Sequence, residues 1–226
     1  MLKPYTILII DDHPLIVEAY KTAIKQAETQ QNQFQFKVTS AEDADQATAV
    51  INQFKHQNSS PDLVILDIKI PPSSDGKILS GEDLAPVLKA TFNNLKLIVS
   101  TTFNNNYRLN SILKQINPDG LLVKNDITSK TLEEAMITVI NQPPFYSKTV
   151  LQLLRKTASN NYLIDEIDRR LLYEISIGTR MNELPDVINL SKAALEKRKR
   201  NLKEVFKVQN NDDRSLIIQA KKEGYV

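Results

Sequence analysis

The chain of 226 residues contains no cysteine, no tryptophan and only two histidines. Without cysteine there can be no disulfide, thiolate zinc site or thiol nucleophile, and His13 and His56 lie too far apart in the sequence for us to expect a histidine metal site. No apolar run approaches the roughly 18 residues that a membrane-spanning helix needs. Acidic residues follow the first short apolar run immediately, unlike the layout of a signal peptide, so we expect a cytoplasmic protein without a membrane partner.

What the sequence does contain is typical of a globular protein, with 41% hydrophobic and 25% charged residues. Its length suits two domains. The formal net charge of +2 conceals an uneven distribution, because residues 1–141 hold 13 basic and 16 acidic residues, whereas Lys192–Lys207 holds seven basic and two acidic residues. The positive charge is therefore concentrated in one segment of the second half.

The first 141 residues alternate between short apolar runs and segments with helical spacing. Runs of this kind are typical of parallel strands that are buried on both faces. The alternation predicts an α/β fold with a doubly wound, five-stranded parallel sheet, in which a site lies at the carboxyl ends of the strands. The five predicted strands are Tyr5–Ile10, Phe36–Thr39, Leu63–Leu66, Leu95–Ser100 and Leu121–Val123.

Helical spacing follows each predicted strand. The first helix is predicted over Pro14–Glu28, and the spacing from Ser40 to Asp43 is that of a capping box, which predicts the start of the second helix at Ser40. Pro143–Pro144 is expected to end the fifth helix. The predicted buried stripe of the first helix is Leu15, Ala19, Ala23 and Ala27.

No strand pattern is found after Asp165, and apolar residues recur there at helical spacing. This pattern predicts a small all-helical domain over residues 164–226. Residues 142–163 are predicted to be a linker that carries one helix at Lys148–Lys156. We therefore expect a sheet domain over residues 1–141, followed by this linker and the helical domain.

Polar side chains stand directly after several predicted strands. Asp11 and Asp12 follow the first strand and Asp67 follows the third, so the three carboxylates should converge at one edge of the sheet. Converging carboxylates repel one another and need a cation, and oxygen ligands favour Mg²⁺ or Mn²⁺. Thr101 and Lys124 follow the fourth and fifth strands, where a hydroxyl and an ammonium would suit phosphoryl oxygens. The pattern predicts phosphoryl transfer to a carboxylate.

Four motifs in these segments resemble the receiver domain of two-component response regulators: IIDDHP at 9–14, LVILDIKIP at 63–71, LIVST at 97–101 and GLLVK at 120–124. The resemblance covers residues 5–141 and implies a flavodoxin-like fold. It also implies that Asp67 accepts a phosphoryl group from a phosphohistidine of a sensor histidine kinase. By the same resemblance Mg²⁺ is bound by Asp12, Asp67 and the backbone carbonyl of Lys69, with Asp11 close by or acting through water. Thr101 and Lys124 then contact the phosphoryl oxygens.

The sequence departs from the receiver pattern at two places. The segment after Asp67 is longer by several residues than is usual before the third helix, which extends the loop beside the site. Leu121 stands three residues before Lys124, where many receivers have the Tyr or Phe that rotates inward on activation. With Leu121 at this position, activation cannot proceed through an aromatic ring there.

The segment MNELPDVINLSKAALEKRKRNLKEVF predicts a helix, a tight turn and a basic helix. Asn189 can adopt the left-handed conformation of such a turn, and Ser191 is a favourable N-cap. Residues 164–226 resemble the helix-turn-helix output domain of NarL/FixJ-type (LuxR-like) regulators, which implies binding in the major groove of double-stranded DNA. The predicted inward stripe is Leu195, Leu202, Val205 and Phe206. The predicted DNA-binding residues, on the exposed side, are Ser191, Lys192, Lys197, Arg198, Lys199, Arg200 and Lys203.

These inferences predict a response regulator that is phosphorylated on Asp67, binds DNA and forms a homodimer at least when phosphorylated. One alternative is a signalling adaptor whose helical domain binds a protein, and another is a receiver that does not use phosphate. A third is a magnesium-dependent phosphatase of the haloacid-dehalogenase type. Lys69 argues against it, because such enzymes have a second carboxylate two residues after the nucleophile. We therefore expect that the chain is a regulatory protein and not an enzyme. Its receiver would catalyse only its own phosphoryl transfer and dephosphorylation.

Overall fold

The computed structural model describes residues 4–31, 34–104, 106–159, 164–208, 212–222 and 225–226. The chain divides into two compact units, the first made of Met1–Asn104 and Ser111–Val150 and the second of Asn105–Asn110 and Leu151–Val226. Each unit is described by itself. Within the described ranges, none of the helices combines the length and the apolar character that crossing a membrane requires.

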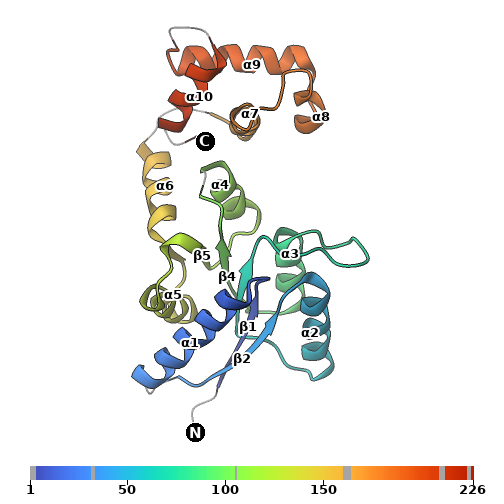
Figure 1. Ribbon diagram of the computed structural model, residues 1–226, viewed down its shortest axis with the longest axis vertical. Helices are drawn as coiled ribbons and strands as arrows, with labels where there is room; N and C mark the ends of the chain where they lie inside the picture. Colours follow the sequence, from blue (N-terminus) through green and yellow to red (C-terminus); the bar gives the residue numbers. More distant parts are fainter. Residues whose placement is uncertain (1–3, 32–33, 105, 160–163, 209–211, 223–224) are drawn as a thin grey trace. The chain divides into compact units, whose positions relative to one another are not determined.

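The first unit contains a parallel sheet with the strand order β2-β1-β3-β4-β5-β6 (Figure 1). This is the flavodoxin-like order, in which the chain winds outward from β1 to both sides. The five predicted strands are all present and parallel. The strands are β1 (Tyr5–Ile10), β2 (Phe36–Ala41), β3 (Leu63–Asp67), β4 (Lys96–Thr101), β5 (Gly120–Val123) and β6 (Phe145–Tyr146).

The sixth strand, β6, corrects the predicted strand count of five. It lies in the segment that was expected to be a linker, where Phe145 N donates to Asp119 O and Ser147 N donates to Leu121 O. Two residues after a pair of prolines are too few to show an alternating pattern, so hydrogen bonds to β5 define this strand.

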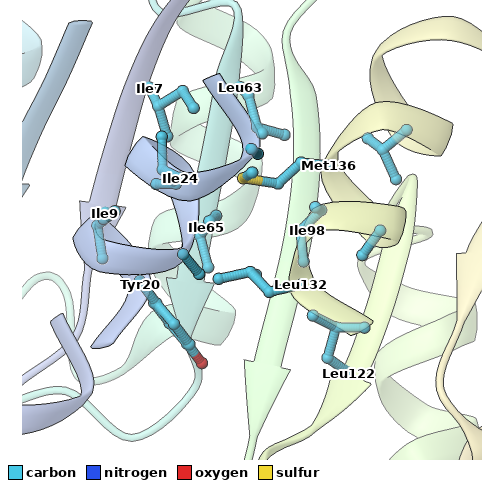
Figure 2. Packing of buried hydrophobic residues seen from close by; sticks show 14 of the residues in the cluster. Ile7, Ile9, Tyr20, Ile24, Leu63, Ile65, Ile98, Leu122, Leu132 and Met136 are labelled. Carbon is cyan, nitrogen blue, oxygen red and sulfur yellow. The ribbon is translucent and has the colours of Figure 1, made fainter. Parts of the chain in front are cut away.

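Helices cover both faces of the sheet. One face packs against α1 (Pro14–Gln31) and α5 (Ser129–Asn141), whereas α2 (Ala44–His56) and α3 (Gly81–Thr91) lie on the other (Figure 1). Figure 2 shows the core of the first face, which burial of apolar side chains from strands and helices together stabilises. Its labelled residues are Ile7, Ile9, Tyr20, Ile24, Leu63, Ile65, Ile98, Leu122, Leu132 and Met136. The remaining helices of this part of the chain are α4 (Asn106–Gln115) and the short 3₁₀ helix η1 (Lys124–Asp126).

Two local predictions in this unit are wrong. Leu15 is 86% exposed, and the buried side of α1 is instead made by Val17, Tyr20, Ala23, Ile24 and Ala27. The N-cap of α2 is Asp43, whose side chain accepts from Gln46 N, because Ser40 continues β2 and pairs with Ile9 of β1. Ala19 of the predicted stripe is exposed as well. Packing of α1 against the face of the sheet overrides the local pattern in the first case, and the pairing of β2 with β1 overrides it in the second.

The helices after β6 are α6 (Lys148–Ser159), α7 (Glu166–Ser176), α8 (Leu184–Ile188), α9 (Lys192–Val205) and α10 (Asp213–Lys222). α6 begins where the sequence predicted. α7 to α10 surround one apolar core, as expected for a small all-helical domain. Val205 is an exception to the predicted inward stripe, because it is exposed. The buried residues of this core are Ile164, Leu171, Leu172, Leu184, Ile188, Leu195, Leu202, Phe206, Leu216, Ala220 and Tyr225.

Candidate functional site

Two buried carboxylates and one ammonium meet at the carboxyl ends of the strands. Asp11 follows β1 and Asp67 ends β3, and the pairing of Ile10 with Leu66 places their strand ends side by side. Both side chains are 1% exposed. Lys124, which follows β5, places Nζ 2.7 Å from Asp11 Oδ2 and 2.6 Å from Asp67 Oδ2. The structure therefore brings these three residues together, as the strand-end argument predicts.

The pKa values at this cluster reflect burial and mutual charge. Burial raises the pKa of Asp67, against the opposing effects of the hydrogen bond and charge of Lys124 and of the N–H of Lys69. Burial alone would lower the pKa of Lys124, but its bonds to Asp11 and Asp67 outweigh burial and raise it. Lys124 is thus the cation that compensates for the removal of the carboxylates from water.

Asp12 adds a third carboxylate, and its surroundings fit a metal ion. Its Oδ1 is shielded from solvent and accepts no hydrogen bond among the described residues. Nδ1 of His13 lies 2.6 Å from this oxygen. Asp11, Asp12, His13 and Asp67 can each present a ligand atom within 4.8 Å of the others. Converging carboxylate oxygens are the donor set of a hard divalent cation such as Mg²⁺ or Mn²⁺.

His13 is a neighbour of this cluster that the sequence argument set aside. Its backbone N–H donates to Asp11 Oδ1 at 3.0 Å, and its ring is 57% exposed. The ring therefore borders the carboxylates from the solvent side. Its position directly after the Asp11–Asp12 pair was the available signal.

Thr101 and Lys69 flank the phosphoacceptor candidate. Asp67 pairs in register with Ser100, so Thr101 lies at the same sheet edge, one residue further on, and it is fully buried. Its Oγ1 accepts a hydrogen bond from Phe103 N at 3.1 Å. The N–H of Lys69 donates to Asp67 Oδ1 at 3.1 Å, so the backbone of residue 69 lies beside this carboxylate. Lys69 Nζ also lies 4.8 Å from the ring centroid of Phe103, a cation–π distance.

The long loop after Asp67 has a defined structure. Ser73 Oγ donates to Asp75 Oδ1 at 2.7 Å and accepts from Ile78 N at 3.0 Å. Hydrogen bonds from Ser73 and Lys77 lower the pKa of Asp75 to about 2. The loop ends at Gly81, where a Cβ atom would overlap the backbone oxygen of Asp67. Gly81 is therefore required for the close approach of α3 to the phosphoacceptor candidate.

A buried hydroxyl pair lies next to the carboxylates. Tyr20 Oη and Ser100 Oγ are 2.7 Å apart. Burial raises the pKa of Tyr20 despite the hydrogen bond to Ser100, and the charges of Asp11 and Asp67 raise it further. Tyr20 is thus held as a neutral phenol beside the charged site. Sequence reasoning missed it, because a tyrosine at helical spacing is usually a core residue.

Replacing Tyr20 by Phe should lower the free energy of unfolding by about 1–2 kcal/mol, because Ser100 Oγ would remain buried without its partner. The combined variant Tyr20→Phe with Ser100→Ala should recover part of this loss, because neither polar group would then be left unpaired. Urea unfolding of the wild type, Tyr20→Phe, Ser100→Ala and the combined variant measures the coupling free energy between the two hydroxyls. Strictly additive losses would show that the two hydroxyls do not depend on each other.

Replacing Lys124 by Met should lower the free energy of unfolding by about 3 kcal/mol in the absence of divalent cations, because two buried carboxylates would lose their cation. Mg²⁺ should restore more stability to this variant than to the wild type. Unfolding in EDTA and in Mg²⁺ checks both effects. Lys96→Met is the control, because Lys96 and Asp119 are more exposed and their pair should contribute less than about 1 kcal/mol. Equal losses in the two variants would contradict the assignment of Lys124.

The second unit contains the predicted turn between α8 and α9. Asn189 has the left-handed conformation, with φ of 55°, and Pro185 lies in the first turn of α8. Ser191 is the N-cap of α9, and its side chain accepts from Ala194 N at 3.3 Å. Helix, turn and basic helix are therefore arranged as the sequence predicts.

The basic residues of α9 separate into two groups. Arg198 contacts Asp165 and Asp168 of the same unit at 2.8 Å each. Lys199 and Lys203 contact Asp213 at 2.9 and 2.8 Å. These three side chains are 30%, 19% and 12% exposed, so the prediction that they lie on the exposed side of the helix is wrong. Acids that are distant in the sequence hold them, as no local pattern in α9 could reveal.

The other group is free of such contacts. Lys192, Lys197 and Arg200 are exposed and form no ion pair within the described part of the chain. With Ser191 they form a basic surface at the start and middle of α9. This surface, rather than the whole set of bases, is available to a partner.

Comparisons with known proteins agree with this architecture. The response regulator receiver domain family matches residues 7–136, and no curated protein matches the chain. A structure of two RcsB dimers bound to two parallel DNAs has a TM-score of 0.60 at 21% identity, over 97% of this chain and 98% of that chain. RcsB from Salmonella enterica serovar Typhimurium, bound to promoter P1flhDC in the presence of phosphomimetic BeF3⁻, has a TM-score of 0.60 at 21% identity, over 96% and 98%.

A two-component response regulator of the LuxR family from Aurantimonas sp. SI85-9A1 has a TM-score of 0.55 at 15% identity, over 70% of this chain and 100% of that chain. These similarities show the fold, a flavodoxin-like receiver followed by a helical domain. The match to the receiver family covers more than half of the chain and includes Asp11, Asp12, Asp67, Thr101 and Lys124. The chain therefore belongs to the response regulator receiver domain family.

Proposed function

We propose that phosphorylation of Asp67 controls the binding of double-stranded DNA by the helical unit, so that the chain acts as a transcriptional regulator. The observation that carries this proposal is the buried Asp11–Lys124–Asp67 cluster in a chain that also presents an exposed basic helix. In this proposal residues 1–141 form the receiver and residues 164–226 the DNA-binding domain. Residues 142–163 connect them and include β6 and α6.

Asp67 would accept the phosphoryl group from a phosphohistidine of a sensor histidine kinase. A carboxylate oxygen of Asp67 forms a bond to phosphorus while the bond from phosphorus to the histidine nitrogen breaks, and the nitrogen keeps the electron pair. Lys124 and the hydroxyl of Thr101 would contact the phosphoryl oxygens. Lys124 already lies 2.6 Å from the carboxylate, so little movement is needed for this contact.

Asp11, Asp12, Asp67 and the backbone carbonyl of Lys69 would hold Mg²⁺, for which Mn²⁺ can substitute. The convergence of ligand atoms from Asp11, Asp12 and Asp67 within 4.8 Å of one another supports this assignment. The ion would supply positive charge that balances the phosphoryl oxygens. The receiver would catalyse only its own phosphoryl transfer and dephosphorylation, since Lys69 stands where a phosphatase of the haloacid-dehalogenase type needs a carboxylate.

The basic surface of α9 supports the DNA-binding half of the proposal. Lys192, Lys197 and Arg200 would contact backbone phosphates, and Ser191 with the first turns would lie near base edges in the major groove. Arg198, Lys199 and Lys203 would act chiefly by fixing α9 to its own domain. The RcsB structures contain DNA, and one of them contains dimers. A homodimer of this chain, at least when phosphorylated, would place two copies of α9 on half-sites about one helical turn apart.

Two measurements on the full chain in solution test this proposal. Incubation of the full chain with acetyl phosphate and Mg²⁺ should add one phosphoryl group to the intact mass, and an unchanged mass contradicts the receiver half. Binding to mixed-sequence duplexes should weaken steeply as salt increases. If no duplex binds even at low salt, the DNA-binding half of the proposal fails, and the alternative of a signalling adaptor whose helical domain binds a protein takes its place as the hypothesis to test.

A further inference from the structure

Between Lys192 and Arg200, the exposed face of α9 contains one acid among bases. Glu196 is exposed, and Lys192, Ala193, Lys197 and Arg200 are its exposed neighbours on the helix. At 100° per residue these five positions lie within an arc of about 140°. This arc faces away from the domain, because Leu195 and Leu202 on the opposite side are buried in the core.

The orientation of this face is fixed by ion pairs from three other side chains of α9. Arg198 is held by Asp165 and Asp168 at the start of α7, and Lys199 and Lys203 are held by Asp213 at the start of α10. With these side chains held and the apolar side buried, α9 has a fixed orientation about its axis within its own domain. Whatever docks on the domain through α9 therefore meets Glu196.

Glu196 has no intramolecular partner among the residues described above. Acids on a helix surface commonly pair with bases four residues away, here Lys192 and Arg200. No ion pair or hydrogen bond of its carboxylate is found within the residues that the structure describes. An unpaired carboxylate in a phosphate-binding surface weakens non-specific binding, because DNA phosphates repel it.

A carboxylate on such a helix is favourable only where a hydrogen-bond donor meets it. In the major groove the donors on base edges are the amino groups of cytosine N4 and adenine N6. Carboxylates pair with cytosine N4, whereas the adjacent N7 acceptor of adenine repels a second acceptor and suits an amide side chain. Glu196 is in the second turn after the Ser191 N-cap, in the half of a recognition helix that approaches base edges.

We propose that Glu196 is a specificity-determining residue that accepts a hydrogen bond from the N4 amino group of a cytosine in the target duplex. This inference rests on the proposed DNA-binding function. The bases around Glu196 supply affinity through phosphates, and Glu196 selects sequence. An amide at this position should exchange the preferred cytosine for adenine.

The test is selection of bound duplexes from a random library by the full chain treated with acetyl phosphate and Mg²⁺. Wild type should enrich a motif with a fixed cytosine, Glu196→Gln should enrich the same motif with adenine at that position, and Glu196→Ala should lose the preference there. Affinity of Glu196→Gln for the wild-type motif should fall about ten-fold or more. Glu204→Gln is the matched control, because Glu204 is exposed two turns further along α9 and should leave the motif unchanged.

The outcomes separate the two claims. If wild type enriches no sequence, both the DNA-binding proposal and the role of Glu196 are overturned. If wild type enriches a motif and Glu196→Gln enriches an identical one, DNA binding stands and the role of Glu196 is overturned. Tighter binding of Glu196→Gln to every duplex by the same factor also overturns it, because that result shows repulsion without base recognition.

Discussion

Asp67→Asn is expected to abolish the uptake of a phosphoryl group from acetyl phosphate and Mg²⁺, leaving the intact mass unchanged. The amide that this substitution introduces would keep the shape of the side chain but lacks the carboxylate charge that attacks phosphorus. Lys124 would retain Asp11 as its partner, so the fold should persist. Mass spectrometry of the intact protein over a time course measures the effect.

Asp75→Asn is the matched control for this experiment. Asp75 is an exposed carboxylate in the loop that follows Asp67, and the structure places it outside the cluster around Lys124. This variant should be phosphorylated as fully as wild type. Equal phosphorylation of Asp67→Asn and wild type would show that another residue is the acceptor.

Replacing Lys192, Lys197 and Arg200 together by Ala is expected to weaken binding to all duplexes about a hundred-fold or more at low salt. Each of these side chains is exposed and free of ion pairs among the described residues, so each can release counterions from the DNA backbone. The slope of log affinity against log salt should become shallower by up to about 3, since each lost phosphate contact removes about 0.9. Fluorescence anisotropy of a labelled duplex across a salt series measures both quantities.

The matched control removes the same charge from another helix of the same unit. Arg214, Lys221 and Lys222 of α10 are exposed, and their replacement by Ala should change the salt slope far less. Similar slopes in the two triple variants would mean that net charge, and not the face of α9, drives binding.

The sequence was sufficient to predict that Asp11, Asp67 and Lys124 meet at one edge of the sheet, because strand ends are local features. An apolar run followed by an acid identifies Asp11 and Asp67, and parallel pairing of the strands then places them together. Lys124 follows the fifth run in the same way. Predicting that the three side chains converge required only the topology of the sheet, which the alternation of strands and helices indicates.

Features that depend on distant partners could not be predicted. Arg198 looked as exposed as Arg200 in the sequence, but acids about 30 residues earlier hold it. Leu15 has the spacing of a buried residue, yet α1 turns Val17 and Tyr20 toward the sheet instead. β6 exists because β5 offers free backbone groups, and its own two residues contain no strand signal.

The central claim is that phosphorylation of Asp67 controls sequence-specific DNA binding, and one measurement tests it most directly. Fragmented genomic DNA from the source organism is incubated with the full chain after treatment with acetyl phosphate and Mg²⁺, and the retained fragments are sequenced for wild type and Asp67→Asn. Wild type is expected to retain a limited set of fragments that share a motif, and Asp67→Asn is expected to retain them much more weakly. Retention of no specific fragment by wild type, or equal retention by the two proteins, would contradict it.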